Sequence, residues 1–394
     1  MRVMHIFGNF GFGGAEMGAV RLIQSFENTE LTHSICSISS NVSMEKLLPA
    51  RINCYSLGLN GRSYTAFIPL LRLLRSTRTD IAHVNNLAPW FDVAVASKLA
   101  GCRCIETFHG VEGERIKFPG WRRGLLRTAC ALSSRVTAVS ESSKDLLLKL
   151  SGIKGDKIKV LPNGVDTDLF SPPASQDEKR KMRIKYNLPQ NGFLVGCVSA
   201  LRPVKDHEGL IKAFSLFMSN NQSIVKQKNA NLVLVGDGPL ASELRLYSRQ
   251  LGIGEKVIFM GRHNDIHKIL QALDAFILNS KTEGMSYAIL EAMASGLPVI
   301  ATNVGANTEL IHHGTEGYLY SPGDLKSLTG YIGELIRNEA YLLKMKEAAR
   351  KKIVNVYSIN KMVSSYKDLY EEALLKKKGR LPLDERKYVK EWKK

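Results

Sequence analysis

Residues 275–302 read AFILNSKTEGMSYAILEAMASGLPVIAT, and this segment is the most informative about the fold. Its first four residues, Ala275–Leu278, are apolar and typical of a short buried strand. A polar loop containing Gly284 follows, and the spacing of the next apolar residues predicts a helix over Ser286–Ser295. A glycine and a proline then lead into a second strand. Strand, loop, helix and strand in this order predict a βαβ unit and therefore a parallel sheet.

The same alternation runs along most of the chain in two sets of segments. The strands that we expect in the first set are Val3–Phe7, His33–Ser37, Ile81–Asn85, Arg103–Phe108 and Val136–Ser140, and those in the second are Leu194–Val198, Asn231–Val235, Val257–Met260, Ala275–Leu278 and Pro298–Thr302. Between the sets lies 170–192, which is rich in proline, serine and charge, and the pattern is helical from about Ile359. We therefore expect an α/β protein of two Rossmann-like domains, with a ligand cleft between them at the carboxyl ends of the strands.

Composition places the 394-residue chain among globular proteins, with 44% hydrophobic and 23% charged residues. This length suits two domains, or three at most. The six cysteines form no CxxC pair and are too few for a disulfide framework, so we expect reduced thiols. The N-terminus reads as a strand and a glycine turn rather than a signal peptide, and no apolar run approaches the roughly 20 residues of a membrane span. We therefore expect a cytoplasmic protein.

The chain carries a formal net charge of +18, from 55 Lys and Arg residues against 37 Asp and Glu residues. This charge fits phosphates, acidic lipids or nucleic acid as partners. We expect no nucleic-acid partner, because the sequence holds no RRM, KH, zinc-finger or helix-turn-helix pattern.

Two carboxylates accompany the predicted strand, loop and helix. Glu283 lies on the loop before the helix and Glu291 about one and a half turns into it, so both can border one ligand. Gly284 lets the backbone approach that ligand closely, and Ser286 is a plausible N-cap. The backbone amides of Met285–Ala288, including that of Tyr287, would then form an anion site at the start of the helix.

A second candidate site, Ser199–His207, directly follows a predicted strand. Arg202 and Lys205 would lie at its carboxyl end, where a phosphate ligand is expected, and each cation 4 Å from a phosphate charge contributes roughly 4 kcal/mol at an effective dielectric constant of 20. The alternative is an exposed basic turn. Two such cations and a helix N-terminus could hold a departing diphosphate without a metal ion.

Further candidates follow strands of the first set. Gly13 and Gly14 belong to a glycine-rich loop that fails the dinucleotide fingerprint, because Glu16 stands where Gly or Ala is required. That loop either approaches a phosphate or sugar or is a simple tight turn. His109 ends a predicted strand and would point toward the cleft, although a single histidine is more often structural. Asp166-Thr-Asp168 resembles a metal-binding DxD, but we interpret it as an Asx turn or helix cap, and we expect no metal site.

Taken together, these motifs resemble the family-four retaining glycosyltransferases, also called glycosyl transferases group 1. The motifs that carry the resemblance, in chain order, are Gly13-Gly14-Ala-Glu16, Phe108-His109-Gly110, Val139-Ser-Glu-Ser142, Pro162-Asn-Gly-Val-Asp166, Pro203-Val-Lys205, Val235-Gly-Asp-Gly-Pro239 and Glu283-Gly284 through Glu291 to Pro298. They cover residues 1 to about 360, and those in the second half are the more specific in combination.

The resemblance implies a GT-B fold. The domains would be 1–168, which binds the acceptor, and 169–358, which binds a nucleotide-sugar donor. Residues 359–394 would be a helix that returns to the first domain, followed by a basic tail. The implied reaction moves a sugar, with retention and without a metal ion or other cofactor, from a nucleotide-sugar to a glycan or lipid-linked acceptor in bacterial surface polysaccharide synthesis. The nucleotide that we expect is UDP.

The resemblance also implies roles for individual residues. Glu291 would accept the ribose hydroxyls, and Glu283 with the amides after Gly284 would hold the sugar. Lys205 and Arg202 would neutralise the diphosphate, with Gly14 against it. His109 would contact the sugar near its reacting carbon, and the backbone around Met260 and Arg262 would meet the base.

Three positions depart from the family pattern. The usual phosphate-binding arginine is Ala200 here, so we assign its role to Arg202. Glu-Gly-Phe-Gly is replaced by Glu283-Gly-Met-Ser286, which prevents transfer of a sugar preference. The glycine-rich motif, which often ends in arginine, has Met17.

Two basic stretches of the first domain, 70–78 and 117–127, interleave leucines and aromatics with cations. They fit a membrane surface, where each interfacial cation contributes roughly 1 kcal/mol, and they fit equally well two helices whose apolar faces belong to the core. Peripheral contact with the cytosolic face of the membrane would suit a lipid-linked acceptor. Two alternatives to the transferase remain: a GT-B nucleotide-sugar epimerase, and a non-catalytic sugar-nucleotide-binding partner.

Overall fold

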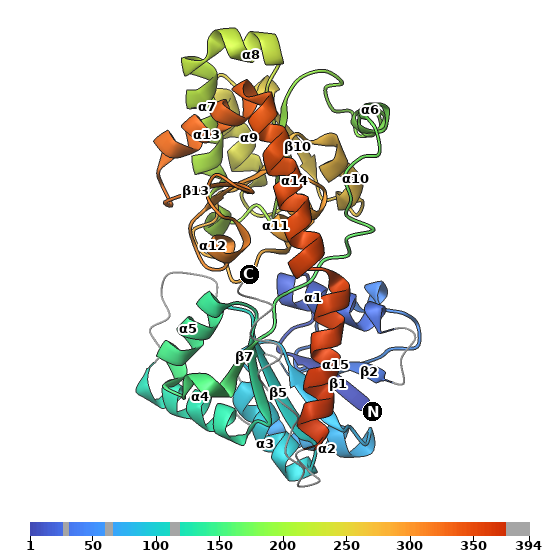
Figure 1. The fold of residues 1–394 in the computed structure, drawn as a ribbon. Coiled ribbons are helices and arrows are strands. Elements are labelled where there is room, and N and C mark those ends of the chain that lie inside the picture. The colour runs from blue at the N-terminus through green and yellow to red at the C-terminus, as the bar shows by residue number, and fades with distance from the viewer. Residues whose placement is uncertain (27–30, 60–65, 111–118, 376–394) are drawn as a thin grey trace. The chain divides into compact units, whose positions relative to one another are not determined.

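The computed structural model of the chain describes residues 1–26, 31–59, 66–110, 119–375. Its contacts divide the chain into two compact units (Figure 1). Among the described residues, unit 1 comprises 1–110, 119–164 and 359–375, and unit 2 comprises 165–358. The expected basic tail, 376–394, and residues 117–118 of the second basic stretch lie outside the described residues.

Unit 1 is built on a seven-stranded parallel sheet of order β3-β2-β1-β4-β5-β6-β7. The strands are β1 (Arg2–Phe7), β2 (Thr32–Ser37), β3 (Asn53–Ser56), β4 (Ile81–Val84), β5 (Arg103–Phe108), β6 (Arg135–Ala138) and β7 (Ile158–Val160). The helices are α1 (Gly14–Ser25), α2 (Phe67–Ser76), α3 (Trp90–Ala100), α4 (Gly120–Leu132), α5 (Glu141–Ser151) and α15 (Ile359–Leu375), with short 3-10 turns at Glu45–Leu47 and Gly155–Lys157.

The C-terminal helix α15 belongs to unit 1, although the whole of unit 2 precedes it in the sequence (Figure 1). Its apolar face packs with strand residues such as Val3, Ile81 and Ile105 in one core cluster. Helix α1 covers a neighbouring part of the sheet, packing Val20 and Ile23 in a second cluster with Phe7 of β1. The expected return of the C-terminal helix to the first domain is therefore confirmed.

Unit 2 is built on a six-stranded parallel sheet of order β10-β9-β8-β11-β12-β13. The strands are β8 (Leu194–Val198), β9 (Asn231–Val235), β10 (Val257–Gly261), β11 (Ala275–Leu278), β12 (Val299–Thr302) and β13 (Gly317–Tyr320). The helices are α6 (Gln176–Lys185), α7 (His207–Asn220), α8 (Gln222–Lys228), α9 (Ala241–Gln250), α10 (Ile266–Ala272), α11 (Tyr287–Ala294), α12 (Asn307–Leu310), α13 (Leu325–Arg337) and α14 (Glu339–Val356), with 3-10 turns η3 (Pro203–Lys205) and Gly254–Lys256.

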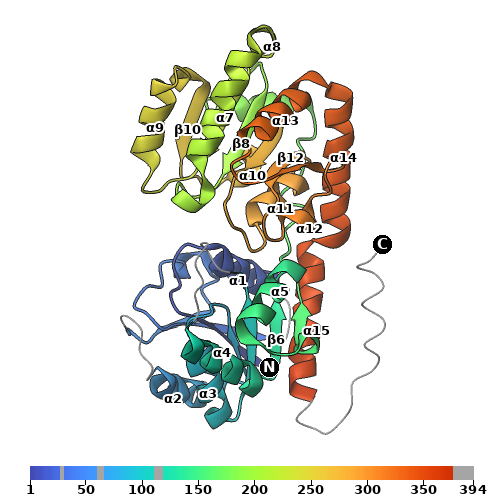
Figure 2. The same ribbon diagram turned by 90° about the vertical axis from the view of Figure 1, so that its left-hand side faces the viewer.

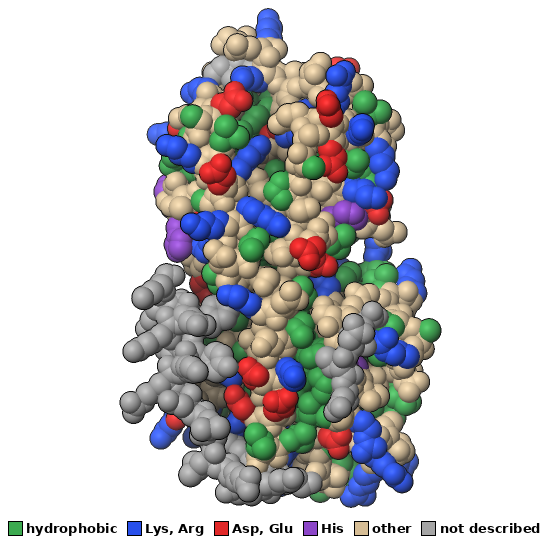
Figure 3. Space-filling model, turned by 45° about the vertical axis from the view of Figure 1, so that its right-hand side comes forward, with side chains coloured by type: hydrophobic (Ala, Val, Ile, Leu, Met, Phe, Trp, Pro, Cys, Tyr) green, Lys and Arg blue, Asp and Glu red, His purple; other side chains and the backbone are tan. Residues whose placement is uncertain are grey.

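All the strands expected from sequence are present, and their ends agree to within two residues. Three further strands, β3, β7 and β13, were not expected. The six cysteines form no disulfide, and four of them are buried. None of the described helices has the length and apolarity needed to cross a membrane. On the face drawn in Figure 3, Lys and Arg side chains are scattered over both units among acidic ones.

Candidate functional site

The loops at the carboxyl edge of the unit 2 sheet bring Lys205 and Glu283 together. Lys205 ends the turn η3 after β8, and Glu283 lies on the loop after β11. The Lys205 Nζ donates to Glu283 Oε1 over 2.5 Å, and the Ser280 hydroxyl donates to the same oxygen over 2.5 Å. The two ionic side chains are 20% and 9% exposed. The pair therefore places one cation and one carboxylate side by side at the end of the sheet where ligands of parallel α/β folds bind.

A chain of hydrogen bonds holds the turn that carries Lys205. Asp206 has a φ of +47°, and the Asn279 amide donates to both its carbonyl, at 2.8 Å, and its carboxylate, at 3.0 Å. The Tyr320 hydroxyl in turn donates to Asn279 Oδ1 over 2.5 Å. Burial raises the pKa of the Asp206 carboxyl, and the nearby Lys281 charge opposes that rise. Tyr320 and Asn279 thus fix, through Asp206, the backbone on which Lys205 stands.

The loop from Glu283 to Ser286 packs against the loop after β12, which contains Gly305 and Ala306. The Ala306 amide donates to the Gly284 carbonyl over 2.9 Å, and a Cβ at Gly305 would lie 1.9 Å from the Glu283 carbonyl oxygen. Gly305 must therefore be glycine for the two loops to lie this close. Ser286 is the N-cap of α11, where its hydroxyl accepts from the Ile289 amide over 3.4 Å.

Helix α11 places Glu291 in its interior, where the residue is 6% exposed. The N-terminus of a helix carries a partial positive charge, and α11 places this end at Tyr287, beside the loop that carries Glu283. Met285 and Ser286, just before this helix, are buried. The expected N-cap and helix are confirmed, whereas the roles of Glu291, Gly284 and the backbone amides of Met285–Ala288 toward a nucleotide stay predictions.

Arg202 and the end of β10 lie at the same edge of the sheet, on either side of the loop after β9. Arg202 is exposed on the turn that carries Lys205, and its carbonyl accepts from the Lys205 amide over 3.0 Å. At the end of β10, the Gly261 carbonyl accepts from the Gly236 amide over 2.8 Å, and this bond ties the loop after β10 to the loop after β9. Met260 is half-buried and Arg262 is exposed there.

The remaining predicted site residues, Gly13, Gly14 and His109, lie in unit 1. A Cβ at Gly13 would lie 2.3 Å from Glu16 Oε2, so this glycine makes room for the carboxylate that folds back over the start of α1. His109 follows β5, and within the described residues its Nε2 is buried without a hydrogen-bond partner. Burial lowers the pKa of His109 to about 4, so its imidazole is neutral near pH 7.

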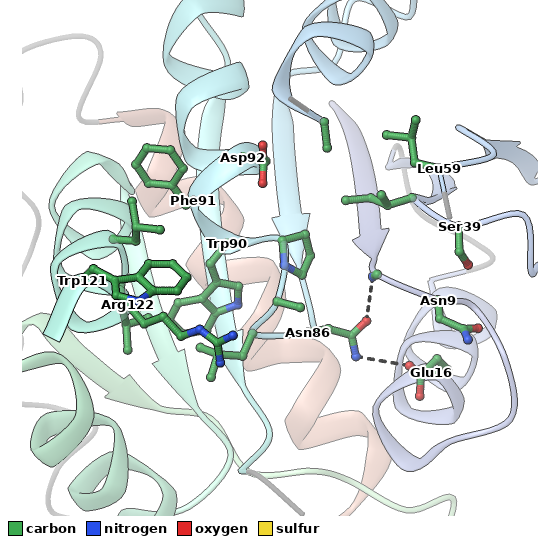
Figure 4. Close-up of a pocket in the computed structure, with 18 residues that line it drawn as sticks. Asn9, Glu16, Ser39, Leu59, Asn86, Trp90, Phe91, Asp92, Trp121 and Arg122 are labelled. Carbon is green, nitrogen blue, oxygen red and sulfur yellow. Dashed lines mark hydrogen bonds between the residues drawn. The ribbon is translucent and has the colours of Figure 1, made fainter. Parts of the chain in front are cut away.

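Unit 1 also contains a cavity of about 650 Å³ that the sequence did not indicate. Figure 4 shows polar side chains, Asn9, Ser39 and Glu16, on one side and aromatic ones from α3 and α4 on the other. The Gly8 amide donates to Asn86 Oδ1 over 3.0 Å, and the Asn86 amide donates to Glu16 Oε1 over 3.2 Å. The aromatic side consists of Trp90, Phe91 and Trp121, with Arg122 beside them.

This lining combines flat apolar rings with a few fixed polar groups. Such a combination suits a small polar ligand with an apolar face, such as a sugar ring. The Arg122 guanidinium lies 5.1 Å from the centre of the Trp121 ring, and Trp121 is 52% exposed. On the aromatic side, Trp121 and Arg122 were noted in the sequence as part of a basic stretch, and on the polar side Glu16 was noted as part of the glycine-rich motif.

Asp166 forms the expected Asx turn, because its Oδ1 accepts from the amides of Asp168 and Leu169 over 3.0 and 2.9 Å. Its carboxylate is thus used within the turn. Among the residues that the structure describes, no group of three or more His, Cys, Asp or Glu side chains is arranged to hold a metal ion.

Two family models match the chain: Glycosyltransferase Family 4 over residues 12–169, and Glycosyl transferases group 1 over residues 178–352. The chain is also 32% identical over 320 residues to the UDP-Gal:alpha-D-GlcNAc-diphosphoundecaprenol alpha-1,3-galactosyltransferase of Escherichia coli, a match that covers 79% of this chain and 80% of that enzyme. The chain belongs to glycosyltransferase family 4.

One further relative and one solved structure are also similar to the chain. The N-acetyl-alpha-D-glucosaminyl L-malate synthase of Bacillus anthracis is 29% identical over 299 residues, or 75% of each chain. The crystal structure of Anabaena HepE in complex with UDP has a TM-score of 0.80 at 21% identity, and the match covers 94% of this chain and all of that one. The second similarity shows the fold, which is GT-B, as the sequence resemblance implied.

Proposed function

We propose that this glycosyltransferase moves a sugar from a UDP-sugar to a lipid-linked glycan during the synthesis of a bacterial surface polysaccharide. The observation that carries the proposal is the cluster of Lys205, Glu283 and Ser280 at the sheet edge. The loop that carries Glu283 leads directly into α11, the helix that contains Glu291. The choice of UDP and of a lipid-diphosphate acceptor draws on the galactosyltransferase from Escherichia coli, whose name states both.

The donor's phosphates are assigned to Lys205, Arg202 and the start of α11. Lysine has three N–H donors, and the contact with Glu283 uses one of them. The helix N-terminus adds backbone donors and a partial positive charge of about half an elementary charge. We propose that these groups stabilise the departing diphosphate, and that the enzyme therefore needs no metal ion.

The carboxylates take the hydroxyl groups of the donor. Glu291 would accept the ribose hydroxyls, and Glu283 would accept a hydroxyl of the transferred sugar. A carboxylate has two acceptor oxygens and can therefore accept hydrogen bonds from two adjacent hydroxyl groups, such as those of a ribose. The backbone at Met260 and Arg262 is assigned to the uracil, and His109, neutral near pH 7, to the sugar.

The proposed reaction proceeds with retention of configuration. The bond between the anomeric carbon and the phosphate oxygen breaks, and the acceptor hydroxyl oxygen forms a new bond on the same face of the sugar. The hydroxyl proton passes to the departing phosphate oxygen, so atoms and charge balance without an enzymatic base. The protein orients the two substrates and stabilises the charge of the leaving group. These two contributions lower the activation barrier of such a reaction most.

The acceptor is assigned to the cavity of unit 1. A sugar ring can lay its apolar face on Trp121 or Phe91 while its hydroxyl groups bond Asn9, Ser39 or Glu16. A lipid-linked acceptor lies in a membrane, so we place the enzyme at the cytoplasmic face of that membrane.

The test is a transfer assay with radiolabelled UDP-sugars and a polyprenyl-diphosphate-linked N-acetylglucosamine. The proposal predicts that label from at least one UDP-sugar enters the organic phase, and that Lys205→Ala abolishes this transfer. Lys212→Ala, an exposed lysine on α7, is the matched control and should transfer normally. Interconversion of UDP-sugars without any transfer would overturn the proposal and favour an epimerase.

A further inference from the structure

Arg350, on helix α14, donates hydrogen bonds to three backbone carbonyls of unit 2. Its Nη1 group donates to the Ala294 carbonyl over 2.6 Å and to the Phe170 carbonyl over 2.7 Å, and its Nη2 group donates to the Thr167 carbonyl over 2.8 Å. Ala294 is the last residue of α11, and α14 packs against that helix (Figure 2). All three acceptors are main-chain groups, so this contact fixes the course of the chain.

The Ala294 carbonyl belongs to the C-terminal end of α11. The last four carbonyls of a helix have no partner within the helix. Three of those in α11, from Glu291, Ala292 and Met293, accept from the backbone amides that follow the helix, over 3.0 Å each. The fourth, that of Ala294, accepts from Arg350 instead. Since a cation also complements the partial negative charge of a helix C-terminus, Arg350 completes the cap of α11 and fixes where the helix ends.

The same guanidinium holds residues 165–172, through which the chain enters unit 2. We call these residues the entry segment. The Gln271 side-chain amide donates to the Ser171 carbonyl over 3.1 Å, and a Cβ at Gly296 would lie 3.0 Å from the Pro172 ring. The entry segment therefore lies against the C-terminal end of α11, and the guanidinium joins the two.

Glu291 is close to the end of α11 that Arg350 caps. It lies three residues before Ala294, which is less than one helical turn and about 4.5 Å along the axis. The Ser295 hydroxyl donates to the Glu291 carbonyl over 2.9 Å and ties this residue to the same end. Because α11 has only eight residues, a displacement of its C-terminal end moves Glu291 with it. The bonds of Arg350 therefore bear on where the Glu291 carboxylate lies.

We propose that Arg350 is a positioning residue of the donor site: it holds the end of α11 against the entry segment and thereby sets the place of Glu291 for the ribose. This inference rests on the proposed function of Glu291. Loss of Arg350 displaces the carboxylate without removing its charge. It should therefore weaken UDP binding less than Glu291→Gln does, by about three- to tenfold.

Arg183 of α6 provides a matched control in the same unit. It also donates to three backbone carbonyls, over 2.9, 3.2 and 3.0 Å, which belong to Ala272, Gln190 and Gly192. These carbonyls precede β11 and β8, so they lie at the amino edge of the sheet, opposite the edge assigned to the donor. Arg183 pairs with Asp274 as well, so its loss should lower stability at least as much as loss of Arg350 does.

The experiment measures the Kd for UDP by titration calorimetry and the Tm of each full-length variant. Arg350→Met keeps the length of the side chain and should raise Kd about three- to tenfold, whereas Arg183→Met should lower Tm and leave Kd unchanged. Arg350→Lys keeps three N–H donors and should recover part of the affinity, and it carries the test if Arg350→Met does not fold. In the Glu291→Gln background, Arg350→Met should change Kd by less than about twofold, because effects that act through one group are not additive.

Three results would overturn the inference: a wild-type Kd in Arg350→Met, an equal rise of Kd in Arg350→Met and Arg183→Met, or an undiminished effect of Arg350→Met in the Glu291→Gln background. Weakened UDP binding in Glu291→Gln beside an unchanged Arg350→Met would refute this inference alone. Normal UDP binding in Glu291→Gln would refute the proposed role of Glu291 itself, and the inference would fall with it.

Discussion

Lys205 and Glu283 stand 78 residues apart in the chain, on two different crossovers of the unit 2 sheet, and their Nζ and Oε1 atoms lie 2.5 Å apart. The carboxylate holds the ammonium group at the carboxyl edge of β8 and β11, with a second tether from Ser280. The position of the ammonium group that we assign to phosphate and that of the carboxylate that we assign to a sugar hydroxyl are therefore set by each other.

Replacing Lys205 with alanine should weaken UDP binding. A hydrogen bond to a charged group contributes about 1.5–3 kcal/mol, which corresponds to roughly a 10- to 150-fold rise in Kd. Titration calorimetry with UDP measures this change. Lys212→Ala removes an exposed lysine of the same unit and should leave Kd unchanged; an equal loss in both variants would mean that the effect is general electrostatics rather than a contact.

Replacing Tyr320 with phenylalanine should raise the donor KM. The change removes the hydroxyl that bonds Asn279 Oδ1, leaves that buried oxygen unpaired and loosens the turn at Asp206 that carries Lys205. The free energy of unfolding should fall by about 1 kcal/mol.

Tyr341→Phe is the matched control for this effect. It removes a similar bond, from the Tyr341 hydroxyl to the Gly314 carbonyl over 2.7 Å, elsewhere in unit 2. It should lower stability to a similar extent and leave the donor KM unchanged. A KM that rises equally in both variants would show that lost stability, and not the Lys205 turn, is responsible.

Three buried histidines under α15 should make unit 1 sensitive to acid. His5, His33 and His83 come from adjacent strands, and His83 Nδ1 lies 2.9 Å from the Tyr370 hydroxyl of α15. Burial lowers the pKa of His33 to about 4 and of His83 to about 3, and it lowers that of His5 well below 6.5. These imidazoles stay neutral in the folded state.

The unfolded chain binds protons at these histidines below pH 6.5 and the folded chain does not, so their stabilising contribution is complete above 6.5 and is lost as the pH falls toward 4. Each contributes a slope of about 1.4 kcal/mol per pH unit in that window. Burial raises the pKa of Glu106 to about 8, which gives the opposite slope for one proton between about 4.5 and 8. Urea unfolding at pH 7 and pH 5 should show the lower stability at pH 5; equal stability would contradict this account.

The sequence predicted the fold well where a strand is a run of buried apolar residues, as in Ala275–Leu278. It missed β3 and β13 because Asn53-Cys-Tyr-Ser56 is polar and half exposed and Gly317-Tyr-Leu-Tyr320 is short and begins with glycine. These two segments are strands because they pair with β2 and β12, and the order of their own apolar and polar residues does not indicate a strand.

The position of the site could be predicted from the sequence, but the contacts within it could not. Glu283, Lys205 and the Ser286 cap stand next to recognisable strand ends, so their region could be inferred. Their contact, and the bond from Tyr320 through Asn279, depend on which strands are neighbours in the sheet. Asn279 and Ser280 did carry a signal, since they are polar residues directly after a buried strand. The cavity of unit 1 could not be inferred, because Asn86, Phe91 and Trp121 line one cavity only in the folded unit.

The product should keep the anomeric configuration of the donor sugar. This follows if the acceptor attacks from the face that the diphosphate leaves, with Lys205 stabilising the leaving group. The coupling constant of the anomeric proton in the NMR spectrum of the purified product measures the configuration. An inverted product would contradict the proposed same-face attack and would require a base in unit 1.

Binding of UDP to unit 2 is the most direct test of the central claim, because it needs neither the sugar nor the acceptor. Thermal unfolding with UDP, GDP or ADP, with and without EDTA, should show stabilisation by UDP that survives EDTA. Glu291→Gln should weaken UDP binding about tenfold or more, as expected for lost bonds to a charged group. Glu347→Gln, an exposed glutamate of α14, should bind UDP as the wild type does. Absence of a shift with every nucleotide, on folded protein, would contradict the donor site, and a shift that EDTA abolishes would contradict the metal-independent mechanism.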